Sequence, residues 1–341
     1  MRSGWLKRPF FGFCLTAAMS LGHAQSMAAD FYAGKTITIV VGFSAGGVYD
    51  QMARLYARHL GRFLPGNPTV VVQNQPGAGS LVTANNLAKL WARDATRLGI
   101  IGSGSVWQPI LGDKQAPYDP RSLAWIGGRT RDTLTCAIWH ESPTSTLADA
   151  RNRETIVGST GPGSITFAIP KALNELAGAK LKLVAGYPGG VEIELAMEKG
   201  EVEGYCGWAF GAVKRTASYK NNKLKFLAQF ADKPNPDLAQ TPLATQIASD
   251  EIGRQVMSFI SSAAVLQWPL LAPAGIDPPR IVDLRQGFDA MLRDRAVLAD
   301  ADQNMLEIAP ISGEDLQSLV ETLTKTPEGV LAIIRRINEI K

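Results

Sequence analysis

The sequence predicts an α/β fold of two similar lobes, each a doubly wound, mainly parallel sheet flanked by helices. Three observations predict it. Short runs of β-branched and other apolar residues alternate with amphipathic segments at helical spacing. This strand–loop–helix pattern occurs twice, over residues 36–125 and again over residues 133–232. A length of 341 residues with 45% hydrophobic residues provides enough material for two cores of ordinary size.

The first module predicts three strands, each followed by a small-residue loop that opens a helix. Thr36–Val41 is short and β-branched, and the segment after it carries Met52 and Leu55 at helical spacing. The next two predicted strands are Thr69–Gln73 and Leu98–Ile101.

The second module repeats the pattern. Its predicted strands are Leu134–Trp139, Thr155–Ser159, Leu181–Ala185, Glu203–Cys206 and Lys225–Ala228. The last ninety or so residues are mostly helical, with prolines that interrupt the pattern, and we expect them to pack back on the first module.

These observations divide the chain into two lobes joined by extended hinges. We predict that residues 25–130 together with 260–341 form lobe 1 and that residues 131–259 form lobe 2. The hinge strands are expected near Trp125–Leu134 and Met257–Leu266. Two α/β lobes arranged in this way leave a cleft between them, and ligands of open α/β sheets bind in such clefts.

Residues 1–24 have the three parts of a secretory signal peptide. The start is basic, through Arg2, Lys7 and Arg8. An apolar run follows over residues 10–21, and residues 22–24 place small side chains where a signal peptidase cuts, with a later cut after residue 28 or 29 as the alternative. The run is shorter than the roughly 20 residues that a membrane-spanning helix needs. We therefore predict a soluble, exported protein.

The net charge of +4 comes mainly from this segment. Residues 1–24 contain three of the 35 basic residues and no acidic one, which leaves 32 basic against 31 acidic residues in the mature chain. A nearly neutral chain has no bulk attraction for nucleic acid or for an anionic membrane surface. The sequence therefore predicts no nucleic-acid partner.

Two cysteines, Cys136 and Cys206, remain after cleavage, and both lie in strand-like segments. In an oxidising compartment they can form a disulfide, and they can equally remain two buried free thiols. The chain has no CxxC or HExxH pattern, so we predict no metal site.

The sequence has no nucleotide-binding motif, and its candidate catalytic residues are sparse. Glycines do not follow the G-x-G-x-x-G spacing, and no phosphate-binding loop occurs. His59 and His140 are the mature chain's histidines, and both are expected at the surface. We predict no catalytic residue and no cofactor.

Small-residue loops follow four of the predicted strands and open the next helices. They are centred on Gly46-Gly47, Ser103-Gly104-Ser105, Thr160-Gly161 with Gly163-Ser164, and Gly189-Gly190. Glycine lets backbone N–H groups approach a ligand, and each helix N-terminus adds about half a positive charge. One such loop can be an ordinary tight turn. Four of them facing one cleft indicate a site for an anion that needs no Lys or Arg.

Some larger side chains near these loops have two interpretations. Asp50 is first interpreted as an acid in the first turn of a helix, favoured by the helix dipole, and second as a ligand contact. Trp107 and Tyr187 lie on cleft loops, where stacking on a ligand and core packing are equally open. Trp208 lies within a strand and is expected in the core.

Three segments, taken in order, resemble one known family. Residues 31–50, with Lys35-Thr36-Ile37-Thr38-Ile39-Val40-Val41 before Gly46-Gly47 and Asp50, resemble the start of the mature substrate-binding receptors of tripartite tricarboxylate transporters, the Bug family. Asn74-Gln75-Pro76-Gly77-Ala78-Gly79 resembles a second family signature, with Gln75 in its basic position. Leu271-Ala272-Pro273-Ala274-Gly275 resembles a late one. The matches span almost the whole mature chain.

The resemblance implies a periplasmic, two-lobed binding protein of class II, the Venus-flytrap type. Such receptors close on a small organic acid (a di- or tricarboxylate, or an aromatic or amino-acid-like carboxylate) and deliver it to the subunits of a membrane permease. We expect a monomer. The family's motif positions, together with the loops above, assign the ligand contacts to Ser44, Ala45, Gly46, Gly47, Tyr49, Asp50, Ser103, Gly104, Ser105, Trp107, Ser159, Thr160, Gly161, Gly163, Ser164, Tyr187, Gly189 and Gly190.

The second-lobe loop departs from the family pattern. Pro188 replaces a basic residue, and Glu192 stands where proline is usual. Glu192 would occupy the first turn of a helix facing the cleft, where it would repel a nearby ligand carboxylate. A monocarboxylate, or an acid with an amine or hydroxyl near that end, would then suit the site better than citrate.

Two alternatives share the same predicted fold. A secreted α/β enzyme acting on a small organic acid would need a convergent acid–base set in the cleft. A ligand sensor would bind in the same way but would have no dedicated permease.

Overall fold

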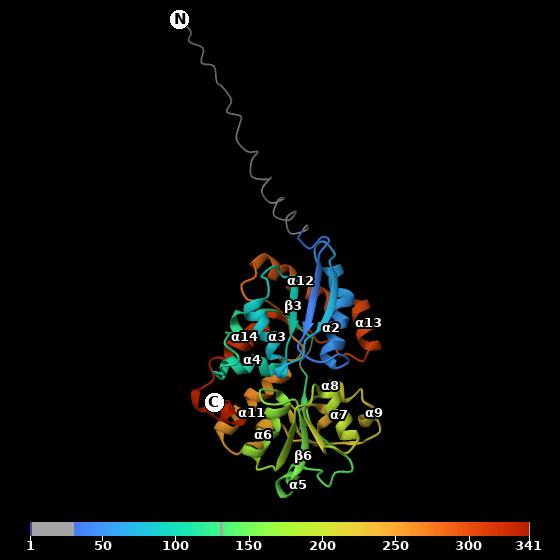
Figure 1. The fold of residues 1–341 in the computed structure, drawn as a ribbon, viewed down its shortest axis with the longest axis vertical. Helices are drawn as coiled ribbons and strands as arrows, with labels where there is room; N and C mark the ends of the chain where they lie inside the picture. The colour runs from blue at the N-terminus through green and yellow to red at the C-terminus, as the bar shows by residue number, and fades with distance from the viewer. Residues whose placement is uncertain (2–30, 130–131, 341) are drawn as a thin grey trace.

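Two mixed sheets, one in each lobe, organise the chain, and the lobes lie one above the other along the longest axis (Figure 1). The computed structural model describes residue 1, residues 31–129 and residues 132–340. The predicted signal peptide therefore lies outside the described residues, apart from Met1. The predicted fold class is confirmed.

The first lobe is built on a six-stranded sheet in the order β11-β4-β10-β3-β1-β2. β1 pairs in parallel with β2 and β3, whereas β10 is antiparallel to β3 and β4. The strands are β1 (Thr36–Val41), β2 (Thr69–Asn74), β3 (Arg97–Ile100), β4 (Ala124–Gly128), β10 (Leu270–Ala272) and β11 (Ile311–Ser312). The helices are α2 (Val48–His59), α3 (Leu81–Asn85), α4 (Ser103–Ile110), α12 (Pro278–Arg293), α13 (Arg295–Gln303) and α14 (Gly313–Leu323), with short turns η1 (Leu60–Phe63), η2 (Ala78–Ser80), η3 (Asn86–Leu90) and η4 (Pro120–Ser122).

The second lobe has a five-stranded sheet in the order β7-β6-β8-β5-β9. β6 pairs in parallel with β7 and β8, and β5 is antiparallel to β8 and β9. The strands are β5 (Leu134–Trp139), β6 (Thr155–Ser159), β7 (Leu181–Ala185), β8 (Gly204–Ala209) and β9 (Leu224–Phe230). The helices are α5 (Leu147–Asn152), α6 (Ile165–Ala177), α7 (Gly190–Glu198), α8 (Phe210–Val213), α9 (Ala217–Lys220), α10 (Ala244–Ile247), α11 (Glu251–Ser261) and α15 (Glu328–Ile337), with η5 (Pro236–Leu238) and η6 (Ser262–Ala264).

Burial explains why β1 and α2 form where they do. β1 lies between β2 and β3, so Ile37, Ile39 and Val41 are fully buried, and β-branched side chains suit such a strand. α2 buries Met52 and Leu55 on the face turned to this sheet. β1 ends at Val41, and the loop after it, which lines the cleft, leads directly into α2.

The second predicted hinge strand is wrong. Most of the segment Met257–Leu266 belongs to α11, which ends at Ser261, and to η6. The side chain of Asp250 caps this helix by accepting a hydrogen bond from the N–H of Gly253 at 2.7 Å. The helix buries an apolar stripe, and a run of apolar residues this dense does not distinguish a strand from a buried helix face.

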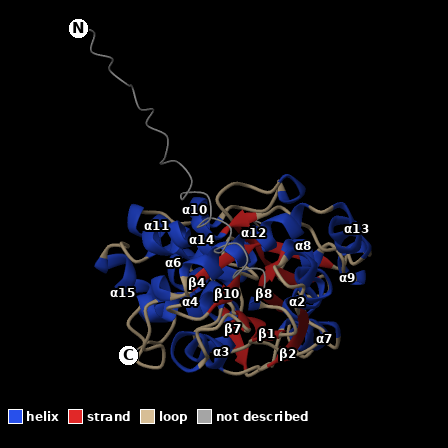
Figure 2. Cartoon of the chain, turned by 90° about the horizontal axis from the view of Figure 1, so that it is seen from above, coloured by secondary structure: helices blue, strands red, loops and turns tan. Residues whose placement is uncertain are grey.

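The helical tail packs on both lobes. α12 and α14 lie against β4, and α13 lies against α2, all in the first lobe. α15 instead contacts α6 and α11 of the second lobe, as Figure 2 shows from above. The side chain of Arg335 in α15 donates a hydrogen bond to the carbonyl of Leu111, just beyond α4, at 2.8 Å. The tail therefore returns to the second lobe while it remains bonded to the first.

Cys136 of β5 and Cys206 of β8, which are 70 positions apart in the sequence, form a disulfide in the structure. The two residues are paired in the antiparallel register of the strands, and both side chains are fully buried. Of the two alternatives open from the sequence, the structure takes the disulfide. The disulfide cross-links the neighbouring strands β5 and β8 of the second sheet.

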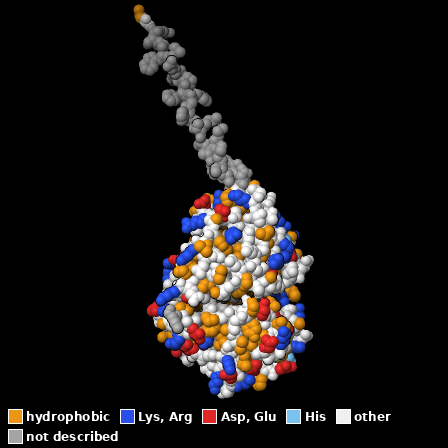
Figure 3. Space-filling model, in the orientation of Figure 1, with side chains coloured by type: hydrophobic (Ala, Val, Ile, Leu, Met, Phe, Trp, Pro, Cys, Tyr) orange, Lys and Arg blue, Asp and Glu red, His pale blue; other side chains and the backbone are white. Residues whose placement is uncertain are grey.

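Basic and acidic side chains are interspersed over the face shown in Figure 3. This distribution agrees with the nearly neutral charge of the chain without residues 1–24. Among the described residues, no helix is long and apolar enough to span a membrane.

Candidate functional site

A cavity of about 560 Å³ lies between the two lobes, where the loops at the ends of several strands face one another. The first lobe contributes the loop from β1 to α2, the start of α4 and the segment after α13. The second lobe contributes the starts of α6 and α7 and the segment from the end of β8 to α9. The predicted cleft between the sheets therefore exists, and it is lined from both sides.

Four helices of at least eight residues begin at this cavity, and none has a side-chain cap. They are α2, α4, α6 and α7, with Gly47, Gly102, Ser164 and Gly189 at their N-cap positions, and all four N-cap residues line the cavity. The Ser164 hydroxyl does not cap α6, because it donates a hydrogen bond to the carbonyl of Gly161 at 2.6 Å. By contrast, side chains of Thr146, Asp250, Asp294 and Ser312 cap other helices. N–H groups in the first turns at the cavity therefore remain available to an acceptor.

Six of the ten first-lobe residues predicted as ligand contacts line the cavity. They are Ser44, Gly46, Gly47, Tyr49, Ser103 and Gly104. The hydroxyl of Tyr49 donates to Oε1 of Gln267 at 3.1 Å, which fixes the ring at the cavity wall. Ala45 is exposed and is not part of the lining.

Asp50 lies in the first turn of α2, as the first of its two interpretations predicted. Its Oδ2 accepts hydrogen bonds from the backbone N–H of Gly46 and from Nε of Arg54, each at 2.9 Å. Burial acts to raise the pKa of Asp50, but these hydrogen bonds outweigh it and the pKa is lowered. Asp50 does not line the cavity, so it holds the loop that does.

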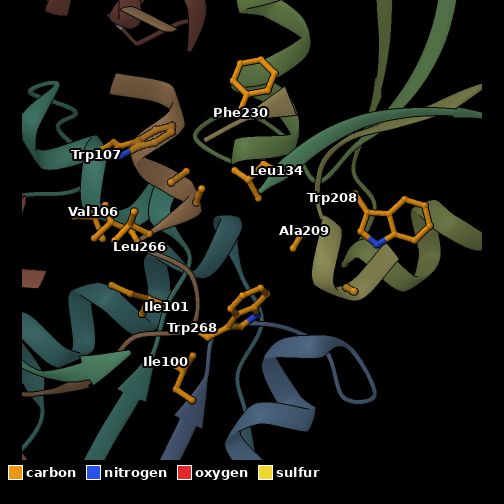
Figure 4. Packing of buried hydrophobic residues seen from close by; sticks show 14 of the residues in the cluster. Ile100, Ile101, Val106, Trp107, Leu134, Trp208, Ala209, Phe230, Leu266 and Trp268 are labelled. Atoms are coloured by element: carbon orange, nitrogen blue, oxygen red, sulfur yellow. The ribbon is translucent and has the colours of Figure 1, made fainter. Parts of the chain in front are cut away.

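Trp107 and Ser105 lie in the protein interior rather than at the cavity. Trp107 is 1% exposed and packs against the ring of Phe259, with the ring centroids 5.3 Å apart. Figure 4 shows Trp107 beside Val106 and Leu266. The hydroxyl of Ser105 lies 2.9 Å from that of Ser80, and the pair supports the loop before α4. Of the two interpretations of Trp107, the structure supports core packing and not stacking on a ligand.

Four second-lobe residues predicted as contacts line the cavity, and four do not. The lining residues are Thr160, Ser164, Gly189 and Gly190. The hydroxyl of Ser159 instead accepts the N–H of Gly161 at 3.0 Å inside the loop. Tyr187 is partly buried outside the lining. Gly163 faces the first lobe beside the cavity.

The lobes touch at the start of α4. A Cβ atom on Gly104 would lie 1.8 Å from the carbonyl oxygen of Gly163, and one on Gly163, where φ is +78°, would lie 1.7 Å from Nε2 of Gln108. The approach of the two backbones therefore requires glycine at position 104, and the positive φ favours glycine at position 163. The structure thus shows the lobes in contact beside the cavity.

Several residues that line the cavity were not predicted as ligand contacts from the sequence. Tyr205 and Trp208 stack with ring centroids 4.9 Å apart and an interplanar angle of 20°, and both contribute to the second-lobe wall. Gln267 and Trp268 line the cavity from the segment before β10. Trp208 was predicted as core; it is 5% exposed and nevertheless lines the cavity, because it stands at the cavity end of its strand. Position at a strand end was the signal that could have identified it.

The acidic side chain in the cavity lining is Glu194, while Oε2 of Glu192 is buried beside Gly189 at the edge of the lining. Glu192 lies in the first turn of α7 as expected, but it is absent from the lining, whereas Glu194, less than one turn further, lines the cavity. Among the described lining residues, the charged side chains are Glu194 and Arg215. Burial, aided by repulsion from Glu198 and opposed by Arg215, raises the pKa of Glu194 to about 7.

This raised pKa predicts a pH-dependent stability. As pH rises from 4.5 towards 7, the unfolded chain loses the Glu194 proton while the folded chain keeps it, so the free energy of unfolding falls. Glu194→Gln should remove that decrease and make the protein more stable than wild type at pH 8 by about 1–2 kcal/mol, after allowance for solvent screening. Urea unfolding between pH 4.5 and 8 checks this. Glu141→Gln, at an exposed loop position, is the control, and identical pH profiles for wild type and Glu194→Gln would contradict the prediction.

A buried ion pair lies where the chain first crosses between lobes. Arg129 follows β4 and Asp132 precedes β5, with Nη2 of Arg129 3.7 Å from Oδ2 of Asp132. The guanidinium carbon of Arg129 lies 3.9 Å from the ring centroid of Trp268, on the cavity wall. Burial lowers the pKa of Arg129 and raises the pKa of Asp132. The hinge is therefore packed directly behind the site.

Among the described residues, no group of three or more His, Cys, Asp or Glu side chains is placed to hold a metal ion.

Similarity to known proteins is clear despite the absence of a match to any protein-family profile. The chain is 43% identical to protein BugT of Bordetella pertussis over 290 residues, which cover 81% of this chain and 82% of that protein. The solved structure of the periplasmic binding protein BugD superposes with a TM-score of 0.69 at 21% identity, covering 91% of this chain and 99% of that one. A Rhodopseudomonas palustris protein solved with adipate gives a TM-score of 0.68 at 20% identity, covering 90% and 98%.

The two solved structures share the two-lobed fold, and the 43% identity over four-fifths of both chains establishes kinship with BugT. Together with the geometry of the cavity, these similarities confirm the resemblance found in the sequence motifs. The chain belongs to the Bug family, and it shares the fold of the periplasmic binding protein BugD.

Proposed function

We propose that this protein captures a small organic carboxylate between its lobes by hinge closure and delivers it to the membrane permease of a tripartite transporter. The observation that carries the proposal is the set of four uncapped helix N-termini at one cavity, two from each lobe. Each supplies backbone N–H donors and a partial positive charge, which favour an anion with several acceptor oxygens.

A carboxylate fits these donors better than a neutral solute does. Hydrogen bonds to an ionised acceptor are roughly twice as strong as those between neutral groups, and here the donors are already fixed by the helices. The lining hydroxyls of Ser44, Ser103 and Thr160 add further polar groups. The related R. palustris protein was solved with adipate, a small organic acid whose carboxylate oxygens are acceptors of the kind that these donors favour.

The same geometry supports a role for hinge closure. The donors at Gly47 and Gly102 belong to one lobe, and those at Ser164 and Gly189 belong to the other, so a ligand can satisfy all of them only when the lobes approach. Such a ligand favours the closed state in proportion to its greater affinity for that state. We propose as contacts the ten sequence-predicted residues that line the cavity: Ser44, Gly46, Gly47, Tyr49, Ser103, Gly104, Thr160, Ser164, Gly189 and Gly190.

A screen of small organic acids against the mature protein tests this function. A true ligand at one hundred times its Kd should stabilise the fold by about 2.7 kcal/mol, which a thermal-shift assay detects easily. Calorimetry then measures Kd, and mass spectrometry of the recovered ligand shows whether it is released unchanged. We expect stabilisation by at least one carboxylate and recovery of that ligand intact. A lack of response to every acid contradicts receptor function, and chemical conversion of the ligand favours the enzyme alternative.

Delivery to a permease needs a separate test in cells. Deletion of the gene should abolish uptake of the ligand found in the screen, and deletion of the permease genes should have the same effect. Uptake that survives loss of the receptor would contradict the transport role and favour the sensor.

A further inference from the structure

The side chain of Glu194 has no hydrogen-bond or ion-pair partner among the described residues, although it lines the cavity. It lies in the second turn of α7, beyond the uncapped first turn that starts at Gly190. The helix places it roughly 6 Å along the axis from that end, at a rise of about 1.5 Å per residue. A ligand carboxylate held at the helix N-termini would therefore extend its far end towards Glu194.

The surroundings of Glu194 are partly apolar and contain few charges. Tyr205 of β8 is on the same wall, stacked on Trp208, and its hydroxyl stays neutral because burial raises its pKa. Arg215, between α8 and α9, is the nearby cation. Its Nη1 donates to Oε1 of Gln51 and to the carbonyl of Asn304 of the first lobe, each at 3.4 Å. Arg215 is thus bonded across the cavity mouth, while the Glu194 oxygens have nothing to accept.

We propose that Glu194 sets the ligand class of this cavity: it selects an organic acid whose far end carries an uncharged hydrogen-bond donor, such as an amide or hydroxyl, over one with a second carboxylate. The inference rests on the proposed carboxylate-receptor function and deepens it. An ionised Glu194 can only accept hydrogen bonds, so it pairs with an N–H or O–H and repels a carboxylate in a site where the charges are poorly screened. The repulsion of a second carboxylate, which the sequence assigned to Glu192, is thus assigned to Glu194, which lines the cavity.

The selection depends on pH, because protonated Glu194 becomes a donor and accepts a second carboxylate as partner. The titratable and charged groups around it are Glu198 on the same helix, Arg215 beside the cavity, and Tyr205 on β8. Glu192 acts on Tyr205, and Arg129 and Asp132 act on Arg215. Since the pKa of Glu194 is about 7, discrimination should be strong at pH 8 and weak at pH 6.

Three six-carbon ligands test the inference by calorimetry on the mature protein. Hexanoate has one carboxylate, adipate has two, and adipic acid monoamide replaces the second carboxylate with an amide of the same size. At pH 8 the wild-type protein should bind the monoamide at least about tenfold more tightly than adipate. This ratio should fall below about threefold in Glu194→Gln and also in wild type at pH 6. Glu192→Gln tests another acid of this helix, whose Oε2 is buried beside Gly189. Glu201→Gln, at an exposed position after α7, is the control and should keep the full ratio.

A second readout follows proton uptake. Adipate binding to wild type at pH 7, measured in two buffers of different ionisation enthalpy, should take up a fraction of a proton, and binding to Glu194→Gln should take up none. The inference is overturned if wild type binds adipate as tightly as the monoamide at pH 8, which is the result expected if Arg215 recruits a second carboxylate. It is also overturned if Glu192→Gln, rather than Glu194→Gln, changes the ratio. Binding of none of the three, hexanoate included, would overturn the carboxylate-receptor function and this inference together.

Discussion

Gly104→Ala should weaken ligand binding by at least about a hundredfold, or about 3 kcal/mol, while leaving the empty protein folded. The added Cβ would lie 1.8 Å from the carbonyl oxygen of Gly163 and 3.0 Å from its carbon, so two backbone segments in different lobes would have to separate. Neither segment is a flexible side-chain end that can turn aside. The clash therefore acts on the closed arrangement, in which the four helix N-termini face one ligand.

The open protein should tolerate the same change. Gly104 lies inside α4 with helical backbone angles, where alanine is favoured over glycine by about 0.5–1 kcal/mol. Thermal unfolding without ligand should therefore be unchanged or slightly shifted upward, and calorimetry with the acid identified by screening should show the loss of affinity. Gly329→Ala in α15 is the matched control, since its Cβ would meet nothing within 4 Å. Equal affinity of Gly104→Ala and Gly329→Ala would show that this contact is not needed for binding.

Asp132→Ala should lower the free energy of unfolding by about 3 kcal/mol, because it leaves Arg129 as a buried charge without its acidic neighbour. The side chains of Arg129 and Asp132 are 2% and 5% exposed. Oδ1 of Asp132 also accepts the N–H groups of Thr133 at 2.7 Å and Gly211 at 3.1 Å, so the substitution removes the partners of two backbone N–H groups in the second lobe. Urea unfolding at pH 7 measures the loss.

An exposed ion pair provides the comparison. Asp289 and Arg293 are 2.7 Å apart on α12 with side chains 40% and 70% exposed, so Asp289→Ala should cost less than about 1 kcal/mol. Replacing both hinge residues, Arg129→Met with Asp132→Leu, should recover part of the stability that Asp132→Ala loses, since no unpaired charge remains. A loss for Asp132→Ala no larger than that for Asp289→Ala would contradict the structural role given to the hinge pair.

Local pattern was sufficient to predict most of the fold. The β-branched run Thr36–Val41 and the strand Thr155–Ser159 appear in the structure with the bounds expected from the sequence. Each is followed by a loop of small residues that ends it, so the strand signal is contained within a few neighbouring residues. Met257–Leu266 failed because its apolar residues suit a strand and a buried helix face equally, and only packing of α11 on α6 and β9 distinguishes them.

The candidate site was predictable in its loops but not in its outer walls. Gly46, Gly104 and Gly189 were found because glycine after a strand signals close backbone approach at that position. Trp268 and Arg215 were missed because nothing near them in the sequence marks a cavity, and they reach it only through the packing of the hinge and of the loops after β8.

The sequence by itself determined the fold class, the two-lobed repeat, the small-residue loops and the family, because these depend on short-range patterns and on ordered motifs. The tertiary structure decided which of those loops meet, that Glu194 rather than Glu192 lines the cavity, and that Trp107 is in the core. Neighbouring residues on a helix differ by about 100° in direction, so the identity of the side chain that faces a ligand depends on how α7 is rotated against its sheet. That rotation is set by packing contacts between residues far apart in the chain, such as Ile193 of α7 against Gly158 of β6.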